Sequence, residues 1–247
     1  MVLVCNDPAF IFLKTTKTAS TSVEFALQPF CLPPEKGDVA ATPAIVTSFG
    51  IVGARGNNIR RSPSFWKFWQ KHAWYNHMPA AAVKENLGAA RFDQAAKIAT
   101  VRNPFDRMVS DFHFFNRDTQ YSAETFSQTR DRFRDYVLSE SWTDDLHIVA
   151  IDGKVVIDHF IRMEHLTDDL MHVAGILGLD KTRLSLPHKK DFKALRKGHS
   201  TTEYFDPDTI DVVHRRMAWV FDHVDYPKTP APPDISDVPT AIAVAER

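Results

Sequence analysis

Lysine and hydroxyl side chains are concentrated in one short segment near the amino end of the chain. The segment consists of Lys17, Thr18, Ala19, Ser20, Thr21 and Ser22. It follows an apolar run and precedes a helical pattern, so free backbone N–H groups and a helix dipole would favour an anion there. Lys17 would add a full positive charge, and the hydroxyls would add donors. The segment predicts a cradle for a multiply charged group, whereas an ordinary helix cap, which uses the same residue types, is the alternative.

A second segment suited to a phosphate follows another apolar run. It reads Val101-Arg102-Asn103-Pro104-Phe105-Asp106-Arg107-Met108-Val109-Ser110. Arg102 suits a phosphate because its planar guanidinium can bind two oxygens at once. Ser110 lies about two helical turns further along. A surface arginine at a helix start is the alternative, but two anion segments in one chain are more specific than either alone.

Neither segment has the pattern of a Walker A nucleotide loop. That loop needs Gly-x-x-x-x-Gly-Lys-Ser/Thr, and residues 17–22 contain no glycine. A magnesium–nucleotide site also needs a carboxylate near the end of a neighbouring strand. Arg102 occupies that place in this chain, and a cation there suits an anion rather than Mg²⁺.

The two segments need strands and helices to hold them. Residues 9–13 form a short apolar run, and residues 96–101 form a mostly apolar one that predicts a second buried strand; such runs are typical of parallel strands. Each run leads into one of the two segments, and helices are expected to begin near residue 23 and to extend over 104–115. Strands that alternate with helices predict an α/β fold with a mainly parallel sheet.

Further elements are expected along the rest of the chain. They are a strand at 44–51, a hairpin at 147–159 around Asp152-Gly153, and helices at 79–87, 122–140, 167–178 and 206–224. The second arm of the hairpin is expected to continue to Arg162. The residues from 227 onward are rich in proline and predict a loose extension.

The composition indicates a folded protein of average character. The chain has 247 residues, a formal net charge of −1, 44% hydrophobic and 25% charged residues. These values exclude global disorder and argue against bulk nucleic-acid binding. Two cysteines cannot build a disulfide framework and fit a reducing compartment. No apolar run is long enough for a membrane helix, and Asp7 and Pro8 interrupt any secretory signal, so we expect a cytoplasmic protein without an integral membrane segment.

The two anion segments resemble the donor site of the PAPS-dependent sulfotransferases, in particular the carbohydrate-type, sulfotransferase family 2-like branch. PAPS is 3′-phosphoadenosine 5′-phosphosulfate. Residues 17–22 resemble its 5′-phosphosulfate loop, Lys-Thr-Gly-Gly-Thr-Ser, with Ala19 and Ser20 in place of two glycines. A left-handed backbone at Ala19 would therefore carry strain. Residues 102–110 match every fixed position of the 3′-phosphate motif, Arg-Asn-Pro-x-Asp-Arg-x-x-Ser, and the aromatic that follows is Phe112.

Weaker similarity in later segments extends the resemblance over roughly residues 9–226. The resemblance implies a P-loop-NTPase-like, three-layer fold with a central, mainly parallel sheet flanked by helices. Residues 1–226 would form a single sulfotransferase domain, and residues 227–247 would form a Pro-rich C-terminal extension.

The resemblance also implies roles for individual residues. The donor would be bound by Lys17, Thr18, Ala19, Ser20, Thr21, Ser22, Arg102, Ser110, Lys197 and Gly198. Lys197-Gly198 resembles a late Lys-Gly-Arg loop of the family with His199 in the last place, although a solvated basic loop is an equal alternative. Asp106 and Arg107 would lock the loop and the helix together.

Sulfuryl transfer needs an in-line nucleophile, neutralisation of the leaving phosphate and removal of the acceptor's proton. Protein cations can replace Mg²⁺ because the transferred group carries less charge, so no metal is expected. Lys17 is the candidate for stabilising the bridging oxygen as the product PAP leaves. His77 is the candidate base, because it precedes a helix where the family places a base and because histidine titrates near neutral pH. His72, His113 and Glu24 are alternatives, and a capping or packing role for His77 stays open.

The expected activity is transfer of a sulfuryl group from PAPS to a hydroxyl of an acceptor, a carbohydrate or a glycolipid. The missing membrane anchor suggests a bacterial type. Aromatic and basic residues over 55–75 could bind such an acceptor, but burial in a core or a dimer surface is the default for them, and homodimerisation is left open. Two alternatives also remain: a P-loop-type nucleotide kinase that needs Mg²⁺, and a non-catalytic protein that binds PAP.

Overall fold

The computed structural model describes residues 1–36, 43–55, 59–61, 69–71, 73–116, 124–186, 196 and 198–231. Of the residues that the sequence singles out, His72 and Lys197 lie outside this described part. The same holds for most of the extension expected over 227–247 and for much of the aromatic and basic segment at 55–75.

The central sheet of the described chain is mixed, with the strand order β10-β7-β2-β1-β4-β3. Its strands are β1 (Leu3–Asn6), β2 (Ala9–Leu13), β3 (Ile45–Val46), β4 (Gly50–Val52), β7 (Ala96–Val101) and β10 (His159–Arg162). Strands β2 and β10 pair parallel to β7, while β1, β4 and β3 add antiparallel pairs beyond β2. The α/β class is confirmed. The two strands that precede the anion segments, which the sequence predicted as buried strands, pair directly with each other in parallel.

The remaining elements connect and cover the sheet. The helices are α1 (Ser20–Leu27), α2 (Ala80–Leu87), α3 (Ala89–Gln94), α4 (Pro104–Phe115), α5 (Phe126–Leu138), α6 (Leu146–Val149), α7 (Leu166–Ile176), α8 (Thr201–Tyr204), α9 (Pro207–Arg216) and α10 (Ala218–His223). Two small antiparallel ladders pair β5 (Ile59–Arg61) with β6 (Trp69–Lys71) and β8 (Ala150–Ile151) with β9 (Lys154–Val155).

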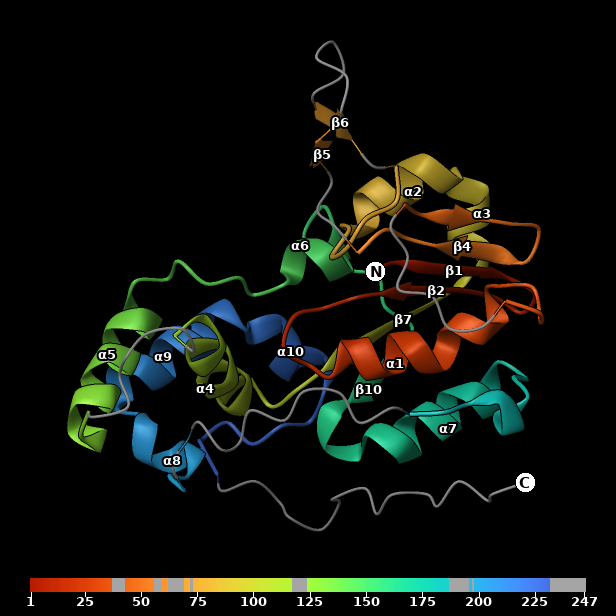
Figure 1. Cartoon of the computed structure of the whole chain (residues 1–247). Coiled ribbons are helices and arrows are strands. Elements are labelled where there is room, and N and C mark those ends of the chain that lie inside the picture. Colours follow the sequence, from red (N-terminus) through yellow and green to blue (C-terminus); the bar gives the residue numbers. More distant parts are fainter. Residues whose placement is uncertain are drawn as a thin grey trace.

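Helices cover both faces of the sheet, which gives three layers (Figure 1). The alternation of side chains along β2 explains this arrangement. Phe10 and Phe12 enter one buried cluster, whereas Ile11 and Leu13 enter the other. Helices α1 and α7 pack on the first cluster, and α2, α4 and α10 pack on the second. Helices α4, α5, α8 and α9 gather beside the sheet, at the end where β2 and β7 finish (Figure 1).

The hairpin expected at 147–159 is shorter than the sequence pattern indicated. Its arms are only β8 and β9, and α6 occupies the residues before them. Residues His159–Arg162 leave the hairpin and join the main sheet as β10 beside β7. Asp158 directs this departure, because its N–H donates to the Lys97 carbonyl at 2.9 Å and its carboxylate accepts the Lys97 N–H at 2.7 Å.

Two other elements differ from expectation. The single strand expected at 44–51 is the β3–β4 hairpin, in which the Thr47 N–H donates to the Gly50 carbonyl at 2.9 Å. The last helix, expected over 206–224, is interrupted at Met217 between α9 and α10. Neither change moves the strands that lead into the anion segments.

Candidate active site

The backbone between β2 and α1 has the shape of an anion-binding nest. Lys17 and Ala19 have left-handed φ angles of 59° and 57°, and Thr18 between them does not. A backbone that alternates in this way tends to turn successive N–H groups toward one point, where an anion can accept them. We call residues 14–19 the nest loop. Ala19 is the N-cap of α1 and no side chain caps the helix, so the hydroxyls do not form an ordinary helix cap. A left-handed alanine costs about 1–2 kcal/mol, the strain expected at this position.

The loop's own hydroxyls hold its shape. Thr18 Oγ1 lies 2.8 Å from Thr15 Oγ1 and 2.7 Å from Thr100 Oγ1. Thr15 Oγ1 donates to the Thr100 carbonyl at 2.6 Å, and Ser20 Oγ donates to the Thr15 carbonyl at 2.7 Å. These bonds tie the loop after β2 to the end of β7. Thr18 and Ser20, both predicted to bind the donor, use their hydroxyls on the loop and on Thr100 of β7 in this structure.

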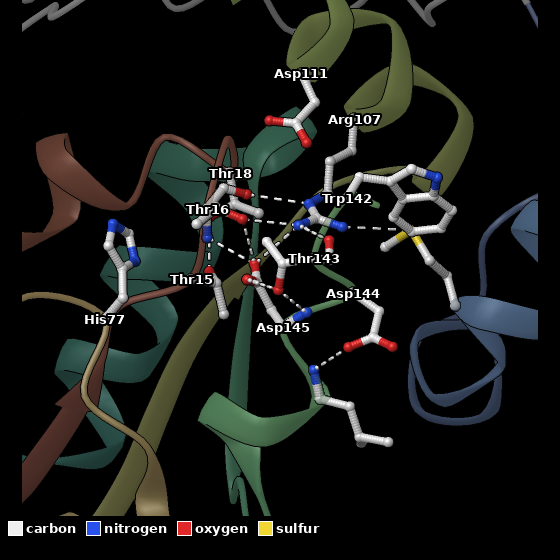
Figure 2. Close-up of polar contacts among 12 residues, drawn as sticks. Thr15, Thr16, Thr18, His77, Arg107, Asp111, Trp142, Thr143, Asp144 and Asp145 are labelled. Atoms are coloured by element: carbon white, nitrogen blue, oxygen red, sulfur yellow. Dashed lines mark hydrogen bonds and ion pairs between the residues drawn. The ribbon is translucent and has the colours of Figure 1, made fainter. Parts of the chain in front are cut away.

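Arg107 braces the same loop from α4 (Figure 2). Its guanidinium is buried, with Nε donating to the Thr16 carbonyl at 3.1 Å and Nη2 donating to Thr16 Oγ1 at 2.7 Å. Nη2 also lies 3.1 Å from Asp145 Oδ2, and that oxygen accepts the Thr16 N–H at 2.7 Å. The three residues form a closed set of bonds, which is the lock that the sequence predicted for Arg107.

Arg102, at the end of β7, has a buried nitrogen without an acceptor. Its side chain is 9% exposed, Nη2 lies 3.4 Å from Asp106, and Nε has no hydrogen-bond partner in the described part of the chain. A buried donor without an acceptor costs about 1–3 kcal/mol, more when the group is charged. An anionic oxygen would therefore fit beside Arg102. Ser110, from the same segment, is buried further along α4.

A second arginine strengthens the positive charge around Arg102. Arg196 Nη1 lies 3.1 Å from Asp106 Oδ1, and Thr201 Oγ1 donates to the same oxygen. Burial alone would raise the pKa of Asp106, but the charges of Arg102 and Arg196 outweigh it and hold that pKa below its usual range. Two guanidinium groups thus share one carboxylate, and the excess positive charge suits an anion.

Lys17 lies against the far end of α4. Its Nζ is 4.0 Å from the centroid of the Phe114 ring, a distance at which the ring face attracts a cation. The neighbouring Phe115 is 67% exposed, and the two rings meet edge to face. One helix therefore contributes to both anion segments, because it begins beside Arg102 and ends beside Lys17.

His77 lies next to the start of the nest loop. Its Nδ1 is 2.9 Å from the Lys14 carbonyl. A carbonyl oxygen only accepts, so Nδ1 carries the hydrogen and the neutral ring has its lone pair on Nε2. Burial lowers the pKa of His77, with Lys14 and the Met1 amine acting in the same direction and the carbonyl and Asp145 opposing them. A neutral imidazole with a free lone pair on Nε2 can accept a proton.

The comparison with protein families identifies the chain. A model of the sulfotransferase family matches residues 1–226. The chain belongs to the sulfotransferase family. Comparisons with the curated proteins and with the solved structures found no match. Family membership supports sulfotransfer in general, by a transferase that takes a sulfate donor such as PAPS and an acceptor.

Two of the segments predicted from the sequence lie at the carboxyl ends of the interior strands β2 and β7. The loop at 17–22 and Arg102 follow neighbouring parallel strands, and Thr21 is half-buried while Ser22 is buried. Gly198 is exposed, with a φ angle of 86°, two residues beyond Arg196. No helix in the described part of this sulfotransferase-family chain is long and apolar enough to cross a membrane.

The alternative bases are differently placed. His113 Nε2 lies 2.8 Å from the Tyr204 hydroxyl, and burial lowers the pKa of His113 to about 4. Glu24 is buried and paired with Lys14 at 2.5 Å, so its carboxylate is part of an ion pair. His72 lies outside the described residues. Of the described candidates, His77 is the one whose side chain bonds to the main chain of the nest loop, at the Lys14 carbonyl.

Three residues at this site were missed from the sequence. Thr100 lies inside an apolar strand, where its hydroxyl reads as an ordinary β-branched residue. Asp145 follows no motif, and its role depends on a long-range contact with Arg107. Arg196 lies in a basic run that reads as a solvated face. The one usable signal was its position beside Lys197-Gly198.

Proposed function

We propose that this chain is a PAPS-dependent sulfotransferase that transfers a sulfuryl group to a hydroxyl of a carbohydrate or glycolipid, with His77 as the general base. One observation carries the proposal: two cationic segments follow the adjacent parallel strands β2 and β7, and buried Arg102 Nε lacks an acceptor among the described residues. PAPS carries charge at its 5′-phosphosulfate and at its 3′-phosphate. Two neighbouring anion sites therefore suit this donor.

The donor's two charged groups would be bound by different elements. The nest N–H groups, Lys17 and the start of α1 with Thr21 and Ser22 would hold the 5′ side. Arg102 and Ser110 would hold the 3′-phosphate, with the charge of Arg196 close by. Thr18, Ala19 and Ser20 would contribute through the backbone, and Lys197 and Gly198 would close the 3′ side as the family resemblance implies.

The reaction is an in-line displacement at sulfur. The acceptor oxygen forms a bond to sulfur while the bond from sulfur to the bridging oxygen breaks, and PAP leaves with that electron pair. His77 Nε2 takes the acceptor's proton, and Lys17 offsets the charge that develops on the leaving oxygen. The Lys14 carbonyl supports this role, because it holds the ring in the tautomer whose Nε2 is free to accept.

Two observations, fewer than for the donor, support a carbohydrate or glycolipid as the acceptor. The loop sequence at 17–22 resembles the carbohydrate-type branch, which supports a sugar hydroxyl as the nucleophile. Phe114 below Lys17 and the exposed ring of Phe115 offer an apolar surface beside the proposed reaction centre. Such a surface suits the apolar face of a sugar ring or a glycolipid.

Calorimetric titration with PAP, with and without EDTA, tests the donor site, and the same titration with Arg102→Ala tests its geometry. We expect binding that EDTA does not change and that Arg102→Ala weakens. Transfer of labelled sulfate from PAPS to a panel of sugar and glycolipid acceptors then tests catalysis. Binding of ATP with Mg²⁺ but not of PAP would favour a kinase, and PAP binding without transfer to any acceptor would favour a non-catalytic binder.

A further inference from the structure

Glu24 is a fully buried carboxylate beneath the nest loop. Its Oε2 lies 2.5 Å from Lys14 Nζ and 2.8 Å from the Met1 amine, and its Oε1 lies 3.6 Å from Arg55 Nη2. Burial would raise the pKa of Glu24, but the amine and Lys14 outweigh it and lower that pKa. The carboxylate therefore stays ionised. A buried charge of this kind is rare unless it is paired, and breaking such a pair is costly.

Two connections lead from Glu24 to the proposed base. The first runs through Lys14, whose side chain pairs with Glu24 and whose carbonyl accepts the Nδ1–H of His77 at 2.9 Å. The second runs through the Met1 amine, which donates to Glu24 and also to Asn76 Oδ1 at 2.8 Å. Asn76 immediately precedes His77. The carboxylate thus holds the partners that fix both the ring and the backbone next to it.

The backbone of His77 needs such support. Its φ angle is 54°, in the left-handed region that non-glycine residues seldom adopt. A conformation of this kind persists only when the surrounding contacts determine it. In the described structure, the Lys14 carbonyl holds the His77 ring and the Met1 amine holds the neighbouring Asn76. Lys14 and Met1 are both bonded to Glu24.

We propose that Glu24 is a positioning residue for His77. It keeps the imidazole oriented toward the nest loop and neutralises the charge of Lys14. The proposal rests on the proposed role of His77 as base. Glu24 itself contacts Lys14, Met1 and Arg55, and the side chains of these residues are not among the proposed donor ligands. Loss of its charge should therefore act on the chemical step rather than on donor binding.

The charges around His77 give the direction of a pH effect. Lys14 and the Met1 amine lower the pKa of His77, and Asp145 raises it. Glu24 faces Lys14 and the Met1 amine, with Arg55 on its other oxygen. Burial lowers the pKa of the Met1 amine to about 4, so near neutral pH Lys14 is the buried cation that Glu24 offsets. Without the carboxylate, the charge of Lys14 acts on His77 uncompensated, so the pKa of His77 falls further. The acidic limb of the kcat profile then moves to lower pH.

The test measures kcat at saturating donor against pH, together with the Kd for PAP, in four proteins. They are the wild type, Glu24→Gln, the double variant Glu24→Gln with Lys14→Met, and His77→Ala. For Glu24→Gln we expect kcat to fall at least about tenfold, which is part of the roughly 10²- to 10⁴-fold that general acid–base catalysis contributes. The Kd for PAP should stay within about twofold, and the acidic limb should move to lower pH.

The double variant removes the cation that Glu24→Gln leaves unpaired, while the Lys14 carbonyl remains in place. We expect its acidic limb to return to the wild-type position, with kcat still reduced because the pair no longer holds the segment. If the single variant does not fold, the same measurements are made on the double variant, since removing both charges of a buried pair is often well tolerated.

The outcomes separate the two proposals. If His77→Ala abolishes turnover while Glu24→Gln leaves the acidic limb in place and lowers kcat only with the folded fraction, the base survives and the positioning role is overturned. If His77→Ala retains full activity, both roles are overturned together, and the PAP titration still reports on the donor site alone.

Discussion

The guanidinium of Arg107 and the carboxylate of Asp145 meet at 3.1 Å, and both hold Thr16 at the start of the nest loop. Each of the two side chains is only 2% exposed to solvent. Asp145 lies on the segment before α6, so the pair links α4, the loop after β2 and a third part of the chain. The conformation of the nest therefore depends on residues far from it in sequence.

Breaking this pair should destabilise the fold. Arg107→Met leaves Asp145 buried without its cation, and we expect the free energy of unfolding to fall by about 3–5 kcal/mol. Denaturant unfolding measures the loss. Arg134→Met is the matched control, because Arg134 pairs with Asp206 and Asp208 on the surface, where water screens the charges, and its loss should change the stability far less. Equal losses in the two variants would contradict the lock.

Arg102 should dominate the affinity for PAP. Hydrogen bonds to charged groups contribute about 1.5–3 kcal/mol each, so Arg102→Ala should weaken binding about 10- to 150-fold in calorimetry. Arg91→Ala serves as a control, because Arg91 donates to Asn6 at an exposed position. A Kd that changes no more for Arg102→Ala than for this control would place the 3′-phosphate elsewhere.

The pH profile should report the base. In the proposed role of His77 as base, the neutral imidazole is the active form, so kcat should rise with pH through the pKa of His77 and then level off. Burial lowers that pKa below the ordinary 6.5, so we expect the midpoint of the acidic limb below pH 6.5. His77→Ala should lower kcat about 10²- to 10⁴-fold and remove the limb. His147→Ala, at an exposed histidine, should leave both unchanged.

Ala19→Gly should stabilise the chain. The left-handed alanine costs about 1–2 kcal/mol, and the added freedom of glycine in the unfolded state costs about 0.4–1 kcal/mol. We therefore expect a net gain of up to about 1.5 kcal/mol in denaturant unfolding. Ala81→Gly, at an exposed position inside α2, should instead lose about 0.5–1 kcal/mol. A loss in both variants would contradict the strain at Ala19.

The sequence predicted the parts of the site that depend on neighbouring residues. The strand at 9–13 is a continuous apolar run and the strand at 96–101 is mostly apolar, because helices cover both faces of the sheet, and the polar segments follow directly. The helix over 104–115 was also predicted to the residue, since Asn103 caps it and Pro104 occupies its first position. Local chemistry determines these boundaries.

The parts that the sequence did not predict depend on distant contacts. Strand β1 is short, and its place between β2 and β4 follows from pairing on both of its edges. The second arm of the hairpin expected at 147–159 ends early, because Asp158 bonds to Lys97 and the residues after it join β7. Arg196 reaches Asp106 across the fold. A pattern read along the sequence does not show which distant residues will be in contact in the fold.

The parallel pairing of β2 with β7 fixes the distance between the two segments proposed to bind the donor. Leu13 pairs with Ala99, so main-chain hydrogen bonds set how far the nest loop lies from Arg102. Side-chain replacements inside the sheet can weaken the fold without altering that interval. Inserting one residue into β7 before Arg102 would shift the guanidinium by about 3.3 Å and reverse the face of every side chain beyond it. The register of the two strands therefore sets the distance between the two proposed anion sites, and with it the length of the ligand that could span them. A substitution that keeps the register does not change this distance.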